Sequence, residues 1–268
     1  MKKIDPYTNP DAQAEATLQA MTNRLEERGK NAEFLNMIRD YTSTLPHDKP
    51  LKVLDLGCGT GVVIRELERV LHKESVLHGA DISENLLQQA RKLTLQSHIE
   101  WDHLNSQALP YDDRCFDVVV MHTLLSHVSD PSIVLAETFR VLKPKATLIV
   151  FDADHASTTY ALPEYDDMRR IDHLLSSSIA THPDICRQLP RYLKAAGFRI
   201  NSHSSRVLSE CGRGDYWLSS VQGYAKMFSQ LEILESQDAG RWVDHMLGSH
   251  EEGTFFAAGV FYTFYAQT

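Results

Sequence analysis

The chain has 268 residues, 43% of them hydrophobic and 24% charged, which is enough apolar material to bury the core of one large domain. A formal net charge of −9 and the lack of any basic run argue against a nucleic-acid partner. No stretch approaches the ~20 apolar residues of a membrane span, and the N-terminus lacks the apolar region of a signal peptide. We therefore expect a cytoplasmic protein with no membrane association.

The four cysteines, Cys58, Cys115, Cys186 and Cys211, are scattered singly along the chain. None forms a CxxC pair, so the sequence predicts neither a disulfide framework nor a zinc site. We expect free thiols and no bound metal.

Strand-like and helix-like segments alternate through the first half of the chain. Strands are expected at 51–56, 75–82, 99–104, 116–122 and 146–154, and helices at 61–73, 83–96 and 131–143. Ser83 is placed to cap the second helix, and Pro131 opens the third. This alternation predicts a doubly wound α/β fold, in which ligands bind at the carboxyl ends of parallel strands.

The remaining segments flank this alternating core. Residues 11–41 have the pattern of one or two amphipathic helices, and 184–198 and 214–231 are further helical segments. Residues 201–210 and 254–267 are predicted strands, which gives a mainly parallel, seven-stranded sheet. We expect an N-terminal helical cap at 1–50 and a core at 51–268, with helical lid insertions at about 155–182 and 211–252. Tyr160, Trp217 and Phe255 would give such a lid an aromatic lining, although single aromatic residues are more often part of a core.

The stretch VLDLGCGTG, residues 53–61, ends a strand in glycines and leads directly into a helix. Bare backbone at such a point lets a ligand contact the main chain. The loop lacks the lysine of a phosphate-binding loop and matches the dinucleotide pattern GxGxxG poorly. Asp55 inside the strand end favours a ligand with a positive group.

Asp81 follows the second strand about twenty residues after the glycines, where a carboxylate can accept hydrogen bonds from both hydroxyls of a ribose. The alternative is that Asp81 only caps the helix that begins near Ser83.

The stretches VLDLGCGTG, ALPYDDRCFDVVV, HTLLSHVSDP and RVLKPKATLIVFD, together with Asp81, resemble class I S-adenosylmethionine-dependent methyltransferases, in particular the ubiquinone and menaquinone methylase group. The resemblance covers about residues 51–154 and implies a Rossmann-like methyltransferase fold with S-adenosylmethionine as cofactor. It implies that the methionine part of the cofactor lies against Asp55 and the loop Gly57, Cys58, Gly59 and Gly61. It also implies that Asp81 holds the ribose, that Ile82 packs on the adenine and that His122 lends its backbone.

Two departures from the family pattern occur. Asn105 and Ser106 stand where the family usually has an acid and an alanine that meet the adenine. The Asn105 carbonyl and the Ser106 N–H still suit this contact. Lys145-Ala146 replaces a Gly-Gly pair in a turn at the opposite edge of the sheet.

In similar enzymes N-terminal helices close over the cofactor, so Arg24 or Arg28 can clamp its carboxylate. We favour Arg28, and the alternative is a solvated basic position on a helix face.

A base is useful when the acceptor is a hydroxyl or a protonated amine. The candidates at the active edge are His122, His127, Asp154 and His155, of which His127 and Asp154 are best placed to face an acceptor. The alternative is that they are structural.

We thus expect methyl transfer from S-adenosylmethionine to a small organic acceptor at oxygen, nitrogen or carbon, yielding S-adenosylhomocysteine, by a monomer or homodimer. The alternatives are a protein or RNA methyltransferase and a non-catalytic domain that senses the cofactor or binds a partner. The acidic balance argues against the first of these, as does the sequence HTLLSH where such enzymes carry an Asn/Asp-Pro-Pro-Tyr/Phe element.

Overall fold

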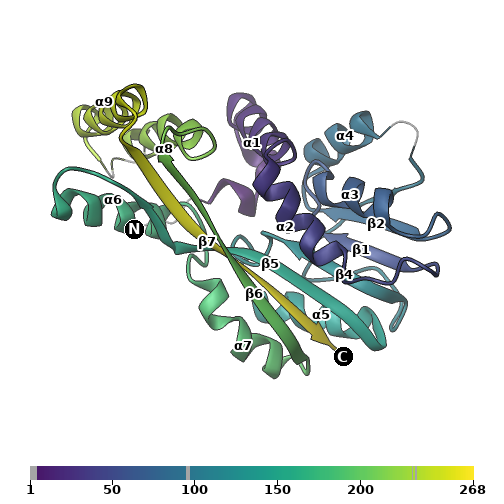
Figure 1. Ribbon diagram of the computed structural model, residues 1–268. Helices are drawn as coiled ribbons and strands as arrows, with labels where there is room; N and C mark the ends of the chain where they lie inside the picture. The colour runs from purple at the N-terminus through teal and green to yellow at the C-terminus, as the bar shows by residue number, and fades with distance from the viewer. Residues whose placement is uncertain (1–4, 95–96, 231, 233) are drawn as a thin grey trace.

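The computed structural model describes residues 5–94, 97–230, 232 and 234–268. Within them the chain forms a seven-stranded sheet of order β3-β2-β1-β4-β5-β7-β6 (Figure 1). The strands are β1 (Lys52–Leu56), β2 (Val76–Asp81), β3 (Glu100–His103), β4 (Phe116–His122), β5 (Leu142–Tyr160), β6 (Arg199–Gly212) and β7 (Phe255–Gln267).

Strands β1 to β5 pair in parallel, and β7 is antiparallel to both β5 and β6. The expected doubly wound and mainly parallel sheet is therefore confirmed. Because the first five strands run in one direction, the carboxyl ends of β1, β2 and β4 lie next to one another at one edge.

The described helices follow the predicted order. They are the short 3-10 turns η1 (Pro6–Thr8) and η2 (Pro10–Ala12), then α1 (Glu15–Arg28), α2 (Ala32–Thr42), α3 (Val62–Val70), α4 (Glu84–Leu93), α5 (Pro131–Val141), α6 (Tyr165–Ser178), α7 (Ile185–Ala195), α8 (Leu218–Gln230) and α9 (Ser236–Glu252). Ser83 caps α4 by accepting a hydrogen bond from the Leu86 N–H at 3.1 Å, and Pro131 is the first residue of α5, both as predicted. Two expected helix ends, at 95–96 and at 231, lie outside the described residues.

The sheet separates two hydrophobic clusters. Successive residues of β4 alternate between them: Val118 and Val120 pack into the cluster that contains α2, α8 and α9, and Val119 and Met121 into the cluster that contains α5 and α7. Both faces of β4 are buried, which explains its almost unbroken run of apolar residues.

The second half of the chain extends the sheet well beyond its core. Strand β5 continues to Tyr160, past the point near 155 where an insertion was expected, and pairs with β7 across a register shift between Asp154 and Thr159. Strands β6 and β7 run alongside it. Helices α6, α8 and α9 gather at one end of these long strands, on the side of the molecule away from β1, β2 and β3 (Figure 1). Tyr160 and Phe255 are fully buried there, so they belong to the core.

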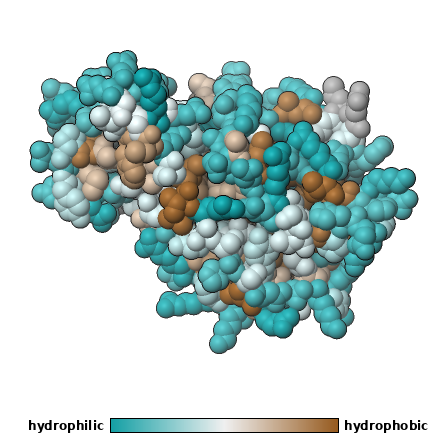
Figure 2. Space-filling model, viewed as in Figure 1, coloured by the Kyte–Doolittle hydropathy of each residue, from teal (hydrophilic) through white to brown (hydrophobic). Residues whose placement is uncertain are grey.

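On the face shown in Figure 2, hydrophilic residues dominate and hydrophobic residues form small separate groups. No described helix combines the length and the apolar character needed to cross a membrane.

Candidate active site

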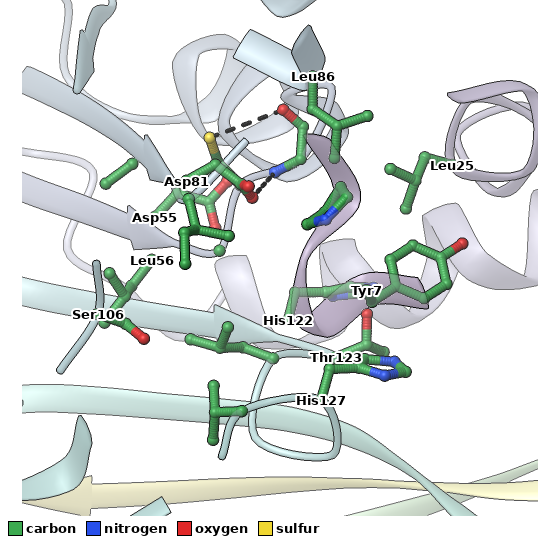
Figure 3. Close-up of a pocket in the computed structure, with 18 of the residues that line it drawn as sticks. Tyr7, Leu25, Asp55, Leu56, Asp81, Leu86, Ser106, His122, Thr123 and His127 are labelled. Atoms are coloured by element: carbon green, nitrogen blue, oxygen red, sulfur yellow. Dashed lines mark hydrogen bonds between the residues drawn. The ribbon is translucent and has the colours of Figure 1, made fainter. Parts of the chain in front are cut away.

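A cavity of about 170 Å³ lies at the carboxyl ends of β1, β2 and β4. Eleven residues singled out from the sequence line it: Arg28, Asp55, Gly57, Cys58, Gly59, Asp81, Ile82, Asn105, Ser106, His122 and His127. Figure 3 shows Asp55 and Asp81 together at the ends of neighbouring strands, with His122, Thr123 and Tyr7 further along the pocket. Topology thus brings together residues that are up to a hundred positions apart.

The glycine loop forms one wall of this pocket. Gly57 and Gly59 have φ angles of +77° and +54°, which favour glycine over residues with a side chain. A Cβ on Gly57 would lie 2.7 Å from the Leu124 side chain, and one on Gly59 would lie 3.0 Å from Leu25. The loop therefore presents bare main chain to the cavity, as the sequence predicts. The buried Cys58 thiol also lines the cavity, and burial raises its pKa well above the usual value.

Asp55 is fully buried at the end of β1, and neither carboxylate oxygen has a hydrogen-bond partner among the described residues. Burial, together with the nearby Asp81 carboxylate, raises the pKa of Asp55 to about 8, although the Ile64 backbone opposes this shift. A buried and unpaired carboxylate is costly unless a cation or a hydrogen-bond donor reaches it. Asp55 therefore marks the place in this pocket that best fits a positively charged ligand group.

Arg28, the last residue of α1, brings a partly buried guanidinium to the same pocket. Its hydrogen bonds run to the Thr123 and Tyr216 hydroxyls, both at 3.3 Å, and no described carboxylate forms an ion pair with it. Arg24 is instead held on the Tyr216 carbonyl and the Ser219 hydroxyl, each at 3.0 Å. Of the two arginines, Arg28 is thus the one that can take an anionic ligand group in this cavity.

Among the described residues, Asp55 gives the pocket a buried carboxyl without a hydrogen-bond partner, and Arg28 gives it a cation without a carboxylate partner. An amino acid with a free ammonium and a free carboxylate has the complementary charges, and a sulfonium adds a further positive group. The methionine part of S-adenosylmethionine therefore fits the residues that line this cavity.

Asp81 lies beside Asp55 and combines both functions considered from the sequence. Its Oδ2 accepts from the Gly59 N–H at 2.8 Å, and its Oδ1 accepts from the Ser83 N–H at 2.9 Å. The carboxylate thus ties the glycine loop to the start of α4, and it also lines the cavity. Burial raises its pKa although these two backbone bonds oppose the shift.

The far end of the pocket is lined by Ile82, Asn105 and Ser106. Ile82 is 44% exposed, which leaves its side chain available for contact with a ring. The Asn105 side-chain oxygen already accepts a hydrogen bond from the Gln107 N–H at 2.9 Å, so a ligand amine would share it. The binding of adenine by these residues stays a prediction.

His122 ends β4, where its ring stacks on Phe151 with 4.3 Å between the centroids. Its Nδ1 lies 2.9 Å from the Tyr41 hydroxyl. Burial and the neighbouring Arg28 lower the pKa of His122 to about 3, so the ring is uncharged. A neutral imidazole does not repel a cationic cofactor, which suits the predicted supporting position of this residue.

His127 also lines the cavity, in the loop between β4 and α5, with its side chain 12% exposed. Three residues near the N-terminus, Tyr7, Thr8 and Pro10, form part of the same wall, and sequence reasoning missed them. The repeated X-Pro pairs at 5–6 and 9–10 predict turns, but turn chemistry alone does not say what a turn covers.

The structure does not bring two predicted site residues to the cavity. The space where Gly61 lacks a Cβ is taken by Trp101, whose ring would lie 2.5 Å from such an atom. Asp154 is buried outside the cavity lining, and its Oδ2 accepts from Nε and Nη2 of Arg187 at 3.1 and 2.9 Å. We correct both assignments: Gly61 makes room for Trp101, and Arg187 neutralises Asp154.

A second cavity of about 20 Å³ adjoins the first and shares Arg28 with it. Its lining comes mainly from β5, β7, α8 and the residues just before α8, and it includes the aromatic side chains of Trp217, Tyr224 and Phe261. His155 lies here, and burial lowers its pKa to about 3. The described residues hold no cluster of three or more metal-ligating side chains.

Comparison with known proteins agrees with this geometry. Residues 54–150 match a protein family described as a methyltransferase domain. The chain is 31% identical over 219 residues to an uncharacterized 37.1 kDa protein in transposon TN4556 of Streptomyces fradiae, covering 80% of this chain and 61% of that protein. It is 32% identical over 164 residues to the ubiquinone/menaquinone biosynthesis C-methyltransferase UbiE of Desulfotalea psychrophila, covering 61% and 64%.

The chain thus spans less than two thirds of the length of these two relatives. Among solved structures, an S-adenosylmethionine dependent methyltransferase from Mesorhizobium loti superposes with a TM-score of 0.52 at 18% identity, over 90% of this chain and 100% of that one. This likeness extends the shared fold to nearly the whole chain. Residues 54–150 thus match a methyltransferase domain, and in this part the chain is similar to the UbiE-like group of S-adenosylmethionine-dependent methyltransferases.

Proposed function

We propose that the protein transfers a methyl group from S-adenosylmethionine to a small organic acceptor. The observation that carries this proposal is the buried Asp55 carboxylate, which faces the glycine-loop cavity without a partner among the described residues. S-adenosylmethionine, when bound, supplies a methyl group that is already electrophilic. The task of this chain is therefore to hold the two reactants in line and to exclude water.

In this proposal different residues of the cavity bind different parts of the cofactor. Asp55 attracts the positive groups, Arg28 binds the carboxylate, and Asp81 accepts from the ribose hydroxyls. The main chain of Gly57 and Gly59 allows close approach, while Ile82, Asn105 and Ser106 bound the adenine. The N-terminal segment 1–50 is the proposed cap, since Tyr7, Leu25 and Arg28 lie in the cavity wall.

His127 is the proposed base. It lines the cavity near Thr123 and Tyr7, and its imidazole can accept a proton from an acceptor hydroxyl. Asp154 is not supported in this role, because it does not line the cavity and its Oδ2 accepts two hydrogen bonds from Arg187.

The acceptor itself is proposed to lie between the two cavities, beside Arg28 and the aromatic residues of the second one. The insertions at 155–182 and 211–252 supply part of that lining and are the proposed lids. The name of the UbiE relative indicates methylation at carbon in quinone biosynthesis, so a naphthohydroquinone is the first probe to try. The four cysteines are free thiols, which suits the proposed cytoplasmic location. We propose a monomer or homodimer.

The proposal is tested by calorimetric titration of the protein with S-adenosylmethionine and S-adenosylhomocysteine in the presence of a chelator. Binding of both is expected without metal, and its absence would refute the proposed cofactor site. Formation of S-adenosylhomocysteine is then followed with 1,4-naphthohydroquinone and with a metabolite extract as acceptors. Cofactor binding without turnover on any acceptor would favour a cofactor-sensing domain instead.

A further inference from the structure

The proposed base does not stand alone in the pocket wall. Nδ1 of His127 lies 2.8 Å from Oδ2 of Asp5, and the two side chains are only 12% and 2% exposed. The two residues are 122 positions apart, so this contact depends entirely on how the N-terminal segment lies over the β4–α5 loop.

Asp5 is held in place independently of His127. Its Oδ2 also accepts hydrogen bonds from the Thr181 N–H at 2.9 Å and the Thr181 hydroxyl at 3.0 Å, and its Oδ1 accepts from the Tyr7 N–H at 3.0 Å. Burial opposes ionisation, but the contacts with His127, Thr181 and Tyr7 outweigh it and lower the pKa of Asp5. The group that meets His127 is therefore a carboxylate, which can only accept hydrogen bonds.

This contact determines which ring nitrogen of His127 carries the proton. Because the carboxylate accepts, Nδ1 must donate, and in the neutral ring Nε2 is left as the proton acceptor. No described residue forms a hydrogen bond with Nε2. The Tyr7 ring packs against the imidazole with 4.8 Å between the centroids, and His155 approaches at 5.9 Å.

We propose that Asp5 is a positioning residue that holds His127 in the Nδ1–H tautomer, so that Nε2 can take the proton of the acceptor. This inference rests on the proposed function, since it gives His127 the part of the base. Asp5 does not touch the reactants and acts only through the imidazole.

The same segment couples this arrangement to the cofactor cavity. Tyr7, Thr8 and Pro10 line the cavity, and at the other end Asp11 accepts from the Glu84 N–H at 2.9 Å and from Asn85 Nδ2 at 3.0 Å at the start of α4. Residues 5–12 thus form a strap fastened to α4 on one side and to His127 and Thr181 on the other. The segment that lines the cofactor cavity is thus also the segment that carries the partner of His127.

The direct test is nitrogen-15 NMR of the histidine side chains in the full-length protein, with His127→Ala identifying the His127 signals. In the wild type we expect protonated Nδ1 and unprotonated Nε2. In Asp5→Asn we expect this preference to be lost, because the amide no longer offers a charged acceptor. Asp11→Asn is the matched control: it loosens the strap at its other end and leaves the partner of Nδ1 unchanged, so the wild-type tautomer should remain.

A wild-type His127 protonated at Nε2, or the same tautomer in wild type and Asp5→Asn, would overturn the inference without any measurement of activity. Methyl transfer to the naphthohydroquinone probe provides the second readout. We expect Asp5→Asn to lower kcat by at least about tenfold and to change the cofactor Kd by less than about threefold. When Asp5→Asn is added to His127→Ala, we expect no further loss of turnover. Additive losses would make Asp5 merely structural, whereas wild-type turnover of His127→Ala would refute the proposed base.

Discussion

Two pairs of buried acids lie at the active edge of the sheet and differ in what surrounds them. Within β5, the Asp152 carboxylate accepts from the Ser126 and Ala153 N–H groups at 3.1 and 2.9 Å, and Oδ2 of Asp154 is paired with Arg187. At the ends of β2 and β1, Asp81 is bound by backbone N–H groups, whereas Asp55 has no hydrogen-bond partner among the described residues.

Burial is nearly the same in both pairs, so it does not identify the ligand-binding acid. The partners do. Both oxygens of Asp152 accept backbone hydrogen bonds, and Asp154 is paired with Arg187 through one oxygen. Both oxygens of Asp55 are without a partner among the described residues, which leaves this acid for a ligand.

The largest expected effect separates His127 from Asp154. His127→Ala should lower turnover by about 10²–10⁴, the usual contribution of a general base to an acceptor that must lose a proton. Asp154→Asn keeps the shape of the side chain and should change turnover little, because this carboxylate forms an ion pair with Arg187. Steady-state rates with the naphthohydroquinone at saturating cofactor make the comparison, and a collapse of turnover in Asp154→Asn would reverse the two assignments.

A second comparison lies within the glycine loop. Gly61→Ala should cost about 2–4 kcal/mol of unfolding free energy, because the residue has φ +81° and its Cβ would meet the rigid Trp101 ring. Gly59→Ala faces the flexible Leu25 side chain and should affect cofactor affinity more than stability. Urea unfolding and calorimetric titration of both variants measure the two quantities. If Gly61→Ala lost as much cofactor affinity as Gly59→Ala and kept its stability, Gly61 would belong to the cofactor-binding site after all.

Much of this arrangement was predictable from the sequence because it is local. The apolar strand followed by glycines, the cap at Ser83 and the alternation of strands and helices follow from short-range patterns, and the parallel topology then places Asp55 and Asp81 together. The strand expected at 99–104 forms as β3, where Asp102 accepts hydrogen bonds from His78 and Tyr111 at 3.0 and 2.7 Å.

The errors arose where a distant side chain decides the role of a residue. Trp101 fills the space beside Gly61, and Arg187 pairs with Asp154 from 33 positions away. The contact of Asp5 with His127 spans 122 positions. No spacing rule or propensity in one sequence predicts such pairings, because they depend on the packed fold.

Asp81→Ala should weaken cofactor binding by about 1.5–3 kcal/mol, since two ribose hydroxyls would lose a charged acceptor. Some apo stability should be lost as well, because the N–H groups of Gly59 and Ser83 lose their partner. Ser83→Ala is the control that removes the cap of α4 and the contact of Ser83 with Asp11 but keeps the Asp81 carboxylate. An unchanged cofactor dissociation constant in Asp81→Ala would leave this residue with only its structural part.

A smaller effect concerns the pH dependence of stability without cofactor. The pKa of Asp55 is about 8 in the folded protein, above the ~3.8 of an unperturbed carboxyl, so folding takes up a proton between these values. This contribution to stability is full below about pH 4 and is lost as the pH rises toward 8. Asp55→Asn should therefore flatten the pH dependence of the unfolding free energy by roughly 1 kcal/mol between pH 7 and 8. Parallel wild-type and variant curves would show that Asp55 is ionised in the fold.

The most direct measurement is the proton release that accompanies cofactor binding. Calorimetric titrations with S-adenosylmethionine at pH 7, in buffers of different ionisation enthalpy, report the number of protons exchanged. If Asp55 is protonated in the free protein, a positive group of the cofactor should lower its pKa and expel the proton. The wild type should then release about one proton more than Asp55→Asn. Equal proton release in the two proteins would contradict the claim that this carboxylate is kept unpaired for the cofactor.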